Sequence, residues 1–222
     1  MIEEILPPEV ATAEAFGDAE ESVAALFPEE RASVARAVER RRQEFATARE
    51  CARRALAGLG LPPGPVPRGE QGAPVWPDGV VGGITHCAGY RAAAVARTAD
   101  LAALGIDAEP QGPLPDGVLD RVSLPEERTT LAALSVREPA VTWDKLLFCA
   151  KEAIYKVWSP AVGTWLGFED ARVTPALDGT FTAELLTPQP SPFRSPLHGR
   201  WLARNGLLVT ALAIPTATVR SR

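Results

Sequence analysis

Two acidic residues end an apolar run at Asp107-Ala108-Glu109. If this run is a strand, residues two apart point to the same face, and both carboxylates emerge side by side. Such oxygen ligands suit a hard cation such as Mg²⁺, which takes one or two carboxylates and completes its shell with water and substrate phosphate. Paired acids also end strands as ordinary surface residues, so this pair alone does not establish a metal site.

The segment WDKLLFCAKEAIYKVW, residues 143–158, has the periodicity of a helix. At 100° per residue, one stripe is apolar, which predicts that this side is core. Glu152 and Lys156 lie on the opposite side at i, i+4 spacing, as in a solvent-exposed ion pair. Phe148 and Tyr155 share that side, so we expect it to be covered and the two charged residues to lie in a cleft. The stripe consists of Trp143, Leu146, Leu147, Ala150, Ile154 and Val157.

Candidate anion-binding groups lie in the first half of the chain. Thr85 and His86 follow a glycine pair, and Arg68 lies in the preceding loop. A hydroxyl, an imidazole and a guanidinium near flexible backbone could together bind a phosphate, although a lone histidine is more often structural. Residues 31–54 are rich in arginine. They form either a local anion site or a solvated helix with ion pairs between arginines and glutamates.

The elements that must position these groups follow from the turn signals. Residues 29–57 contain no Gly or Pro and predict one long helix or two, ending near Gly58 and Gly60. Residues 61–79 are too rich in Pro and Gly for a regular element. The short apolar runs between residues 80 and 109 favour strands at least as much as helices. The loop at 110–117 is the expected domain boundary, which gives lobes of residues 1–111 and 112–222.

The second half repeats this arrangement of elements. Its helix at 143–158 precedes strand-like pieces at 171–174 and 180–186 and a Pro-rich loop at 188–196. Asn205-Gly206 between apolar runs predicts a β-hairpin. Helices accompanied by an antiparallel hairpin in each half indicate an α+β fold of two similar lobes. We identify no repeat of identical residues between the halves.

The amino-acid composition limits the classes of protein to which this chain can belong. Hydrophobic residues make up 46% and charged residues 23% of the 222 residues, so the chain is expected to fold. The net charge of −5 argues against a surface for nucleic acid or anionic membranes. The sequence shows neither an apolar stretch of membrane length nor a basic signal peptide, so we expect a cytoplasmic protein. Three cysteines and two histidines predict neither a disulfide framework nor a zinc cluster.

In this order, the motifs resemble those of the surfactin-type and enterobactin-type 4′-phosphopantetheinyl transferases. The family pattern G-[IV]-D-x-E, followed by [FW]-x-x-K-E-[AS]-x-x-K, is met in full at residues 105–109 and 148–156. Small departures from the family occur at Gly83, Thr85 and Cys149, none of which removes a charged group. The matching segments are residues 44–56, 68–96, 104–110, 143–160 and 165–171.

The resemblance implies a pseudo-dimeric α+β fold with the active site between two similar lobes. It implies transfer of the 4′-phosphopantetheine group from coenzyme A to a serine of an apo carrier protein, with release of 3′,5′-ADP and with Mg²⁺ as cofactor. The magnesium ligands would be Asp107, Glu109 and Glu152, with the backbone of Ala108 near the metal. The catalytic residues would be Asp107, Glu152 as general base, directly or through a water, and Lys156 as a point charge.

The same resemblance assigns basic residues to coenzyme A. Lys151 and Lys156 would contact its phosphates, while Thr85 and His86 would bind the 3′-phosphate. Arginines would complete a basic collar, with Arg53 as a weaker candidate; on an ideal helix Arg41 and Arg49 lie about 80° apart and could converge on one ligand. The expected coenzyme A contacts are Arg41, Arg49, Arg68, Thr85, His86, Asp107, Lys151, Glu152 and Lys156.

Two alternatives remain open at this point. A magnesium-dependent nucleotide phosphohydrolase would also need clustered carboxylates and cations, and a non-catalytic relative could bind carrier domains without turnover. Retention of all three carboxylates and both helix lysines argues against the second. We expect a monomer that serves acyl and peptidyl carrier domains of polyketide, nonribosomal peptide or siderophore synthesis. Apolar side chains would dock these domains, with candidates at Val75, Trp76, Val118 and Leu119.

Overall fold

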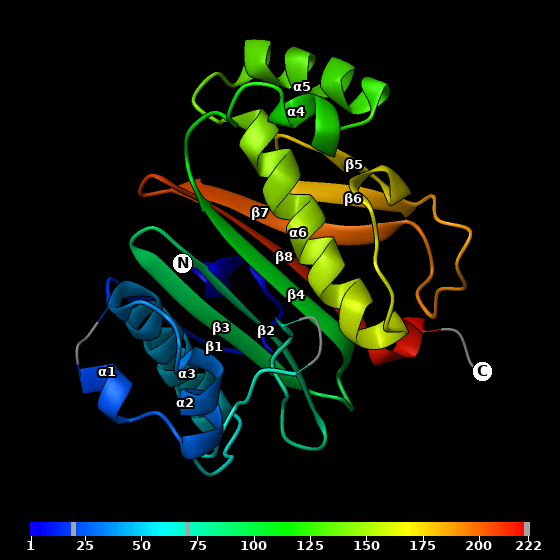
Figure 1. Ribbon diagram of the computed structural model, residues 1–222. Helices are drawn as coiled ribbons and strands as arrows, with labels where there is room; N and C mark the ends of the chain where they lie inside the picture. The colour runs from blue at the N-terminus through cyan, green and yellow to red at the C-terminus, as the bar shows by residue number, and fades with distance from the viewer. Residues whose placement is uncertain (19–20, 70–71, 220–222) are drawn as a thin grey trace.

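The computed structural model describes residues 1–18, 21–69 and 72–219 (Figure 1). Glu70 and Gln71, which belong to one segment of the family resemblance, lie outside the described residues. Two antiparallel sheets are formed, with strand orders β1-β3-β2 and β4-β8-β7-β6-β5. The elements of the first half are η1 (Ile2–Ile5), β1 (Ala11–Phe16), α1 (Glu21–Ala24), α2 (Pro28–Val34), α3 (Glu39–Gly58), β2 (Val80–Cys87), β3 (Tyr90–Arg97) and β4 (Leu101–Pro110).

The second half begins with three helices and ends with two hairpins. At the turn between β7 and β8, Asn205 and Gly206 have φ angles of 54° and 74°. This left-handed pair confirms the predicted hairpin. The elements are α4 (Val118–Val122), α5 (Pro125–Arg137), α6 (Trp143–Val162), η3 (Phe168–Asp170), β5 (Ala171–Pro175), β6 (Thr180–Leu185), β7 (Leu197–Arg204), β8 (Leu207–Pro215) and η4 (Thr216–Thr218).

The core is organised in four layers. α3 packs on one face of the three-stranded sheet, and α6 packs on one face of the five-stranded sheet (Figure 1). The remaining faces of the two sheets pack against each other. Strand β8 is buried on both sides, because Leu208 and Leu212 face α6 while Val209 and Ala211 face the other sheet. The two α+β lobes predicted from the sequence are therefore present.

The change from one sheet to the other falls before the expected lobe boundary. Strand β4 ends at Pro110, yet it pairs with β8 in the five-stranded sheet. The boundary expected at 111/112 therefore does not separate the sheets, which change at the turn between Arg97 and Leu101. A dense Pro/Gly segment marks an irregular connection, but it does not identify the sheet that a preceding strand joins.

Helix α6 lies unusually close to β4. A Cβ on Gly105 would collide with the Ala153 carbonyl oxygen and lie 2.9 Å from a Val157 methyl group. The absence of a side chain at Gly105 therefore allows the helix to approach the strand backbone. This contact places the polar side of α6 beside the end of β4, where Asp107 lies.

The two halves do contain a repeat of identical residues, contrary to our sequence analysis. Pro-Glu-Glu-Arg occurs at residues 28–31 and 125–128 and opens α2 and α5. In both copies the second glutamate accepts a hydrogen bond from the residue that precedes the proline. Phe27 N lies 2.9 Å from Glu30 Oε2, and Leu124 N lies 2.7 Å from Glu127 Oε2. Four residues were too short a match to stand out without the fold.

Within the described residues, no helix combines the length and the apolar character needed to cross a membrane.

Candidate active site between the lobes

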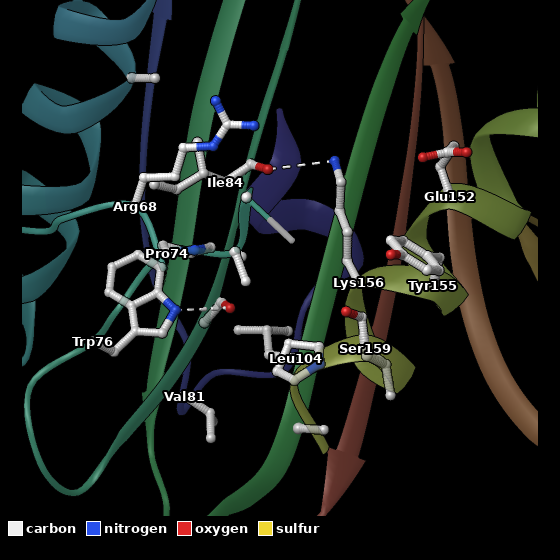
Figure 2. Close-up of a pocket in the computed structure, with 18 of the residues that line it drawn as sticks. Arg68, Pro74, Trp76, Val81, Ile84, Leu104, Glu152, Tyr155, Lys156 and Ser159 are labelled. Atoms are coloured by element: carbon white, nitrogen blue, oxygen red, sulfur yellow. Dashed lines mark hydrogen bonds between the residues drawn. The ribbon is translucent and has the colours of Figure 1, made fainter. Parts of the chain in front are cut away.

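A cavity of about 540 Å³ lies between the lobes (Figure 2). The first half contributes residues of α3, β2 and the loop between them, and the second sheet contributes β4 and α6. Trp76 forms part of the wall, with its indole Nε1 donating to the Gly82 carbonyl oxygen at 2.9 Å. The predicted site residues that line this cavity are Arg41, Arg49, Arg68, His86, Glu152 and Lys156.

Lys156 joins the two lobes at the cavity floor. Its ammonium group donates to Asp107 Oδ1 at 2.7 Å and to the Ile106 carbonyl oxygen at 3.1 Å. It also donates at 3.3 Å to the Ile84 carbonyl oxygen of β2, a contact drawn in Figure 2. Lys156 therefore balances the Asp107 charge while it bridges strands from different sheets.

Three carboxylates lie near this lysine and influence one another. Burial raises the pKa of Glu109, and the negative charge of Asp107 raises it further. The pKa of Glu152 is raised by the same two causes, of which burial is again the larger. Asp107 is 6% exposed, and its Oδ2 is buried without a hydrogen-bond partner. A buried, unpaired carboxylate oxygen is costly, so the group is poised for a further cation or donor.

The acidic residues fit a metal ion whose coordination shell is completed by water and substrate. No group of three or more His, Cys, Asp or Glu side chains within residues 1–18, 21–69 and 72–219 is close enough to enclose a metal by itself. Mg²⁺ does not need such a cage, since it commonly uses one or two carboxylates, water and substrate phosphates. The orphaned oxygen of Asp107 and the neighbouring Glu109 and Glu152 are the available donors. Ala108 is buried and its N–H donates to Thr85, so only its carbonyl could assist.

Thr85 takes a different position from the one we expected. Its side chain is 1% exposed, and its hydroxyl accepts from Ala108 N at 2.9 Å and donates to Asp107 Oδ1 at 3.2 Å. Consecutive strand residues face opposite sides, so His86 reaches the cavity while Thr85 packs towards β4. Thr85 is therefore placed to orient Asp107, and the structure gives no support to a phosphate contact.

Lys151 also lies away from the cavity. Its ammonium group is 2.8 Å from Glu127 Oε2 of α5 and 2.7 Å from the Phe168 carbonyl oxygen. Burial lowers the pKa of Lys151, and the Glu127 carboxylate opposes that shift. Lys151 therefore does not line the large cavity, where we expected it to contact phosphates of coenzyme A; together with Glu152 it lines a smaller neighbouring hollow.

Arg49 forms a rigid part of the opposite wall. Its Nε donates to the Val66 carbonyl oxygen at 2.6 Å, and its guanidinium carbon lies 4.1 Å from the centre of the Phe45 ring. Burial lowers the pKa of Arg49 to about 10, so the group remains a cation near neutrality. Arg68 extends from the loop towards the same cavity (Figure 2). Arg53, the weaker candidate, instead pairs with Glu30.

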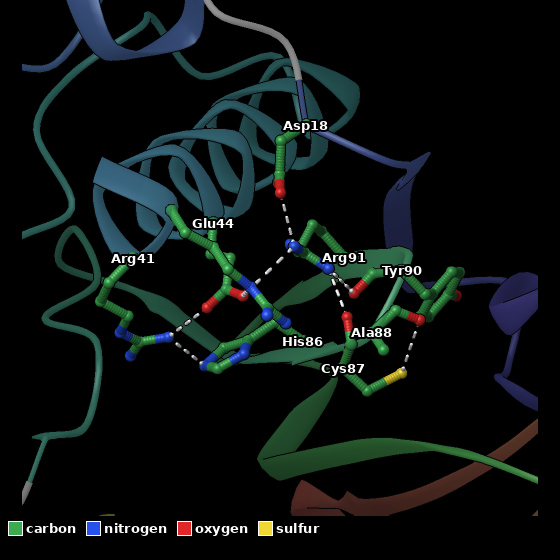
Figure 3. A network of polar contacts seen from close by, with 9 residues as sticks. Asp18, Arg41, Glu44, His86, Cys87, Ala88, Tyr90 and Arg91 are labelled. Carbon is green, nitrogen blue, oxygen red and sulfur yellow. Dashed lines mark hydrogen bonds and ion pairs between the residues drawn. The ribbon is translucent and has the colours of Figure 1, made fainter. Parts of the chain in front are cut away.

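Arg41 and His86 belong to a larger polar network (Figure 3). Arg41 Nη1 donates to His86 Nε2 at 2.9 Å and lies 3.3 Å from Glu44 Oε2. Glu44 Oε1 is 3.8 Å from Arg91, which in turn pairs with Asp18 at 2.6 Å. Desolvation, followed by the charges of Arg41 and Lys156, lowers the pKa of His86 to about 4, although its ring is open to solvent. His86 is therefore a neutral acceptor near neutral pH.

Several contributing residues were not found from the sequence. Glu44 forms the expected ion pairs with Arg40 and Arg41 of its own helix, and it also lies 3.8 Å from Arg91 of β3, a contact that the sequence did not indicate. Tyr155 and Trp165 have ring centres 5.0 Å apart, and with Phe168 they line a smaller hollow that also touches Glu152. Among the four docking candidates, Trp76 lines the cavity, Leu119 packs against the core and Val118 is half-buried, whereas Val75 is exposed.

Comparisons with known proteins agree with this architecture. A model of the 4′-phosphopantetheinyl transferase N-terminal domain matches residues 29–96, and a model of the 4′-phosphopantetheinyl transferase superfamily matches residues 103–210. The chain is 58% identical over 219 residues to 4′-phosphopantetheinyl transferase Svp of Streptomyces mobaraensis, covering 96% of this chain and 89% of Svp. It is 49% identical over 225 residues to 4′-phosphopantetheinyl transferase Npt of Nocardia iowensis, covering 96% of this chain and 99% of Npt.

A more distant match is enterobactin synthase component D of Salmonella typhi, which is 30% identical over 177 residues, or 76% of this chain and 66% of that protein. The chain belongs to the 4′-phosphopantetheinyl transferase superfamily. The predicted family and the enzyme class, a transferase that acts on carrier proteins, are thereby confirmed.

Proposed function

We propose that this chain transfers the 4′-phosphopantetheine group of coenzyme A to a serine hydroxyl of apo carrier proteins, with Mg²⁺ as cofactor and 3′,5′-ADP as the other product. The main support is the division of charge across one cavity. Arg41, Arg49 and Arg68 line one side, while Glu152 and Lys156 line the other. This arrangement suits an anionic nucleotide whose pyrophosphate meets both a metal and a lysine.

The arginine side would bind the nucleotide phosphates. Arg49 is already oriented by the Val66 carbonyl group and by the Phe45 ring. Little side-chain ordering therefore remains to be done when an anion binds. His86, a neutral acceptor of the Arg41 hydrogen bond, could rotate or gain a proton to meet the 3′-phosphate.

The acidic side would carry out the chemistry. Asp107, Glu109 and Glu152 would hold Mg²⁺, which when bound would neutralise charge on the pyrophosphate. Lys156 would add a positive charge beside the leaving 3′,5′-ADP. The serine oxygen attacks the β-phosphorus, the bond from that phosphorus to the bridging oxygen breaks, and the hydroxyl proton passes to Glu152. Glu152 would take this proton directly or through a water, because it is the carboxylate that lines the cavity beside Lys156.

The smaller hollow beside Glu152 suits the pantetheine arm. With the nucleotide on the arginines and the pyrophosphate at Lys156, the rest of the donor extends past Glu152. There it meets Tyr155, Trp165 and Phe168, an aromatic surface that can pack against an uncharged chain. Trp165 is 68% exposed, which leaves this end open to the acceptor.

The acceptors we propose are carrier domains of polyketide, nonribosomal peptide or siderophore synthesis. The basic groups of α3 lie on the coenzyme A side, so docking through apolar contacts such as Val75 should depend only mildly on salt. Action as a monomer in the cytoplasm, and the lobe limits 1–111 and 112–222 as chain segments, stay predictions.

The deciding experiment is mass spectrometry of an apo carrier protein incubated with the chain, coenzyme A and Mg²⁺. The proposal expects a mass increase equal to the phosphopantetheine arm. A phosphohydrolase would instead release nucleotide without any carrier protein, and a non-catalytic relative would leave both reactants unchanged. Either of those results would overturn the proposed function.

A further inference from the structure

Both copies of the Pro-Glu-Glu-Arg repeat place their second glutamate in the same buried environment. Glu30 is 0% exposed and accepts from Phe27 N and from Val66 N, each at 2.9 Å. Arg53, from the long helix α3, donates to both of its carboxylate oxygens at 3.0 Å. The first lobe thus ties a helix start, a long helix and a distant loop to one carboxylate.

The second lobe repeats this arrangement with a different cation. Glu127 is 2% exposed and accepts from Leu124 N and from Val173 N, each at 2.7 Å. Lys151, from the long helix α6, donates to the same carboxylate at 2.8 Å. The two glutamates therefore have equivalent partners in the two lobes.

These contacts exceed what a helix cap requires. A capping glutamate needs only the backbone N–H at the start of its own helix. A fully buried carboxylate with a cation gains little net stability over apolar residues. The contacts to a distant backbone N–H and to the long helix instead fix the position of segments that lead into the active site.

In the first lobe, the contacts of Glu30 extend to Arg49 through a single residue, Val66. The Val66 N–H donates to Glu30, and the Val66 carbonyl oxygen accepts from Arg49 Nε at 2.6 Å. Arg68 lies two residues further along the same loop and lines the same cavity. Glu30 therefore acts on the arginine wall through the backbone at Val66.

In the second lobe, the contacts of Glu127 extend to the hollow beside Glu152. Lys151, bound by Glu127, also donates to the Phe168 carbonyl oxygen at 2.7 Å. Phe168 and Trp165 line that hollow, and Lys151 immediately precedes Glu152 in α6. Glu127 therefore acts on the catalytic side through Lys151.

We propose that Glu30 and Glu127 are equivalent positioning residues, the first for binding of the nucleotide phosphates and the second for turnover. This inference rests on the proposed function. It predicts that the same substitution has different kinetic effects in the two lobes. A purely structural role would give both variants lower stability with the same kinetic constants as the wild type.

The test compares Glu30→Gln with Glu127→Gln. We expect Glu30→Gln to weaken coenzyme A binding in calorimetry about tenfold, with kcat at saturating coenzyme A within about twofold of wild type. We expect Glu127→Gln to lower kcat about tenfold, with the Kd for coenzyme A within about twofold. Glu29→Gln and Glu126→Gln are matched controls, because the first glutamate of each repeat is exposed, and both should retain wild-type constants.

If a single variant fails to fold, the paired variants Glu30→Gln/Arg53→Met and Glu127→Gln/Lys151→Met remove both buried charges and should fold. The first paired variant should still affect mainly the binding of coenzyme A and the second mainly kcat, because the contacts to Val66 and Phe168 are weakened or lost. Equal effects in both lobes, or kinetic constants matching those of the controls, would overturn the inference. A wild-type protein that neither binds coenzyme A nor modifies a carrier protein would instead overturn the proposed function.

Discussion

The two walls of the cavity are held by similar contacts but carry different charged groups. On the α3 side the cavity is lined by guanidinium groups, whereas the α6 side presents a carboxylate and one lysine. Each long helix is tied by a cation to a buried glutamate of the Pro-Glu-Glu-Arg repeat. The supporting contacts are therefore shared, and a few residues on one face of each helix determine which kind of charge that wall can bind.

The electrostatic effects of burial on the two walls are also opposite. Burial lowers the pKa of Arg49 and raises the pKa of Glu109 and Glu152. In each case burial disfavours the charged form. A bound ligand of opposite charge would offset the cost of burying the charged groups on each wall. We therefore expect an anionic substrate and a cation to strengthen the binding of one another between the lobes.

The largest effect is expected from removing charge on the acidic wall. Asp107→Asn should lower transfer about a thousandfold, because the metal site loses a ligand and Lys156 loses its partner. Folding should be retained, since the amide is nearly the same size as the carboxylate. Turnover is measured by the mass of the modified carrier protein over a range of Mg²⁺ concentrations.

Asp120→Asn is the matched control, because the side chain of Asp120 is 78% exposed in α4. It should transfer like the wild type. If Asp107→Asn kept near wild-type turnover at low Mg²⁺, the assignment of Asp107 to the metal would be wrong.

On the basic wall, Arg49→Lys should weaken coenzyme A binding about tenfold or more. Lysine keeps the charge but loses the planar group that stacks on Phe45 and donates to Val66. The loss should be smaller for dephospho-coenzyme A, which lacks the 3′-phosphate. Calorimetry with both ligands checks this, and Arg54→Lys, an exposed residue of the same helix, is the control. An unchanged affinity for both ligands would exclude Arg49 from the site.

The junction between the walls is tested at Thr85. Thr85→Val leaves the Ala108 N–H without its acceptor and removes a donor to Asp107, at a cost of about 1–3 kcal/mol. Thr85→Ser retains the hydroxyl and should stay close to wild type in unfolding by denaturant. The valine variant should also need more Mg²⁺ for half-maximal rate. If serine and valine behaved alike, the hydroxyl would have no positioning role.

The sequence predicted the elements better than their partners. Short apolar runs and turn signals favoured strands at least as much as helices for β2 to β4 and located the final hairpin, because these signals are local. The sheet membership of β4 depends on pairing with β8, which comes from the end of the chain. The repeat in α2 and α5 became recognisable only when its two glutamates were found in matching contacts.

The same distinction applies to the site. The helical pattern correctly separated the apolar stripe of α6 from Glu152 and Lys156. Lys151 could not be assigned in this way, because its partner Glu127 lies in another helix and only the packing of α5 on α6 brings them together. The separation of Thr85 from His86 could have been predicted, since consecutive strand residues face opposite sides.

The smallest effect is expected at His86, as a change in the pH dependence of stability. Its pKa is lowered from 6.5 to about 4 in the folded protein, so the unfolded chain binds more protons between these values. Stability should therefore rise with pH across this window and fall as the pH drops from about 6.5 towards 4. Because the ring is open to solvent, we expect a modest slope. His86→Gln should lose this contribution, so its free energy of unfolding should change less between pH 5 and pH 7 than that of the wild type. An identical change in both proteins, measured by denaturant unfolding, would mean that His86 does not distinguish the two states. Burial and the charge of Arg41 would then not lower the pKa of His86 in the folded protein.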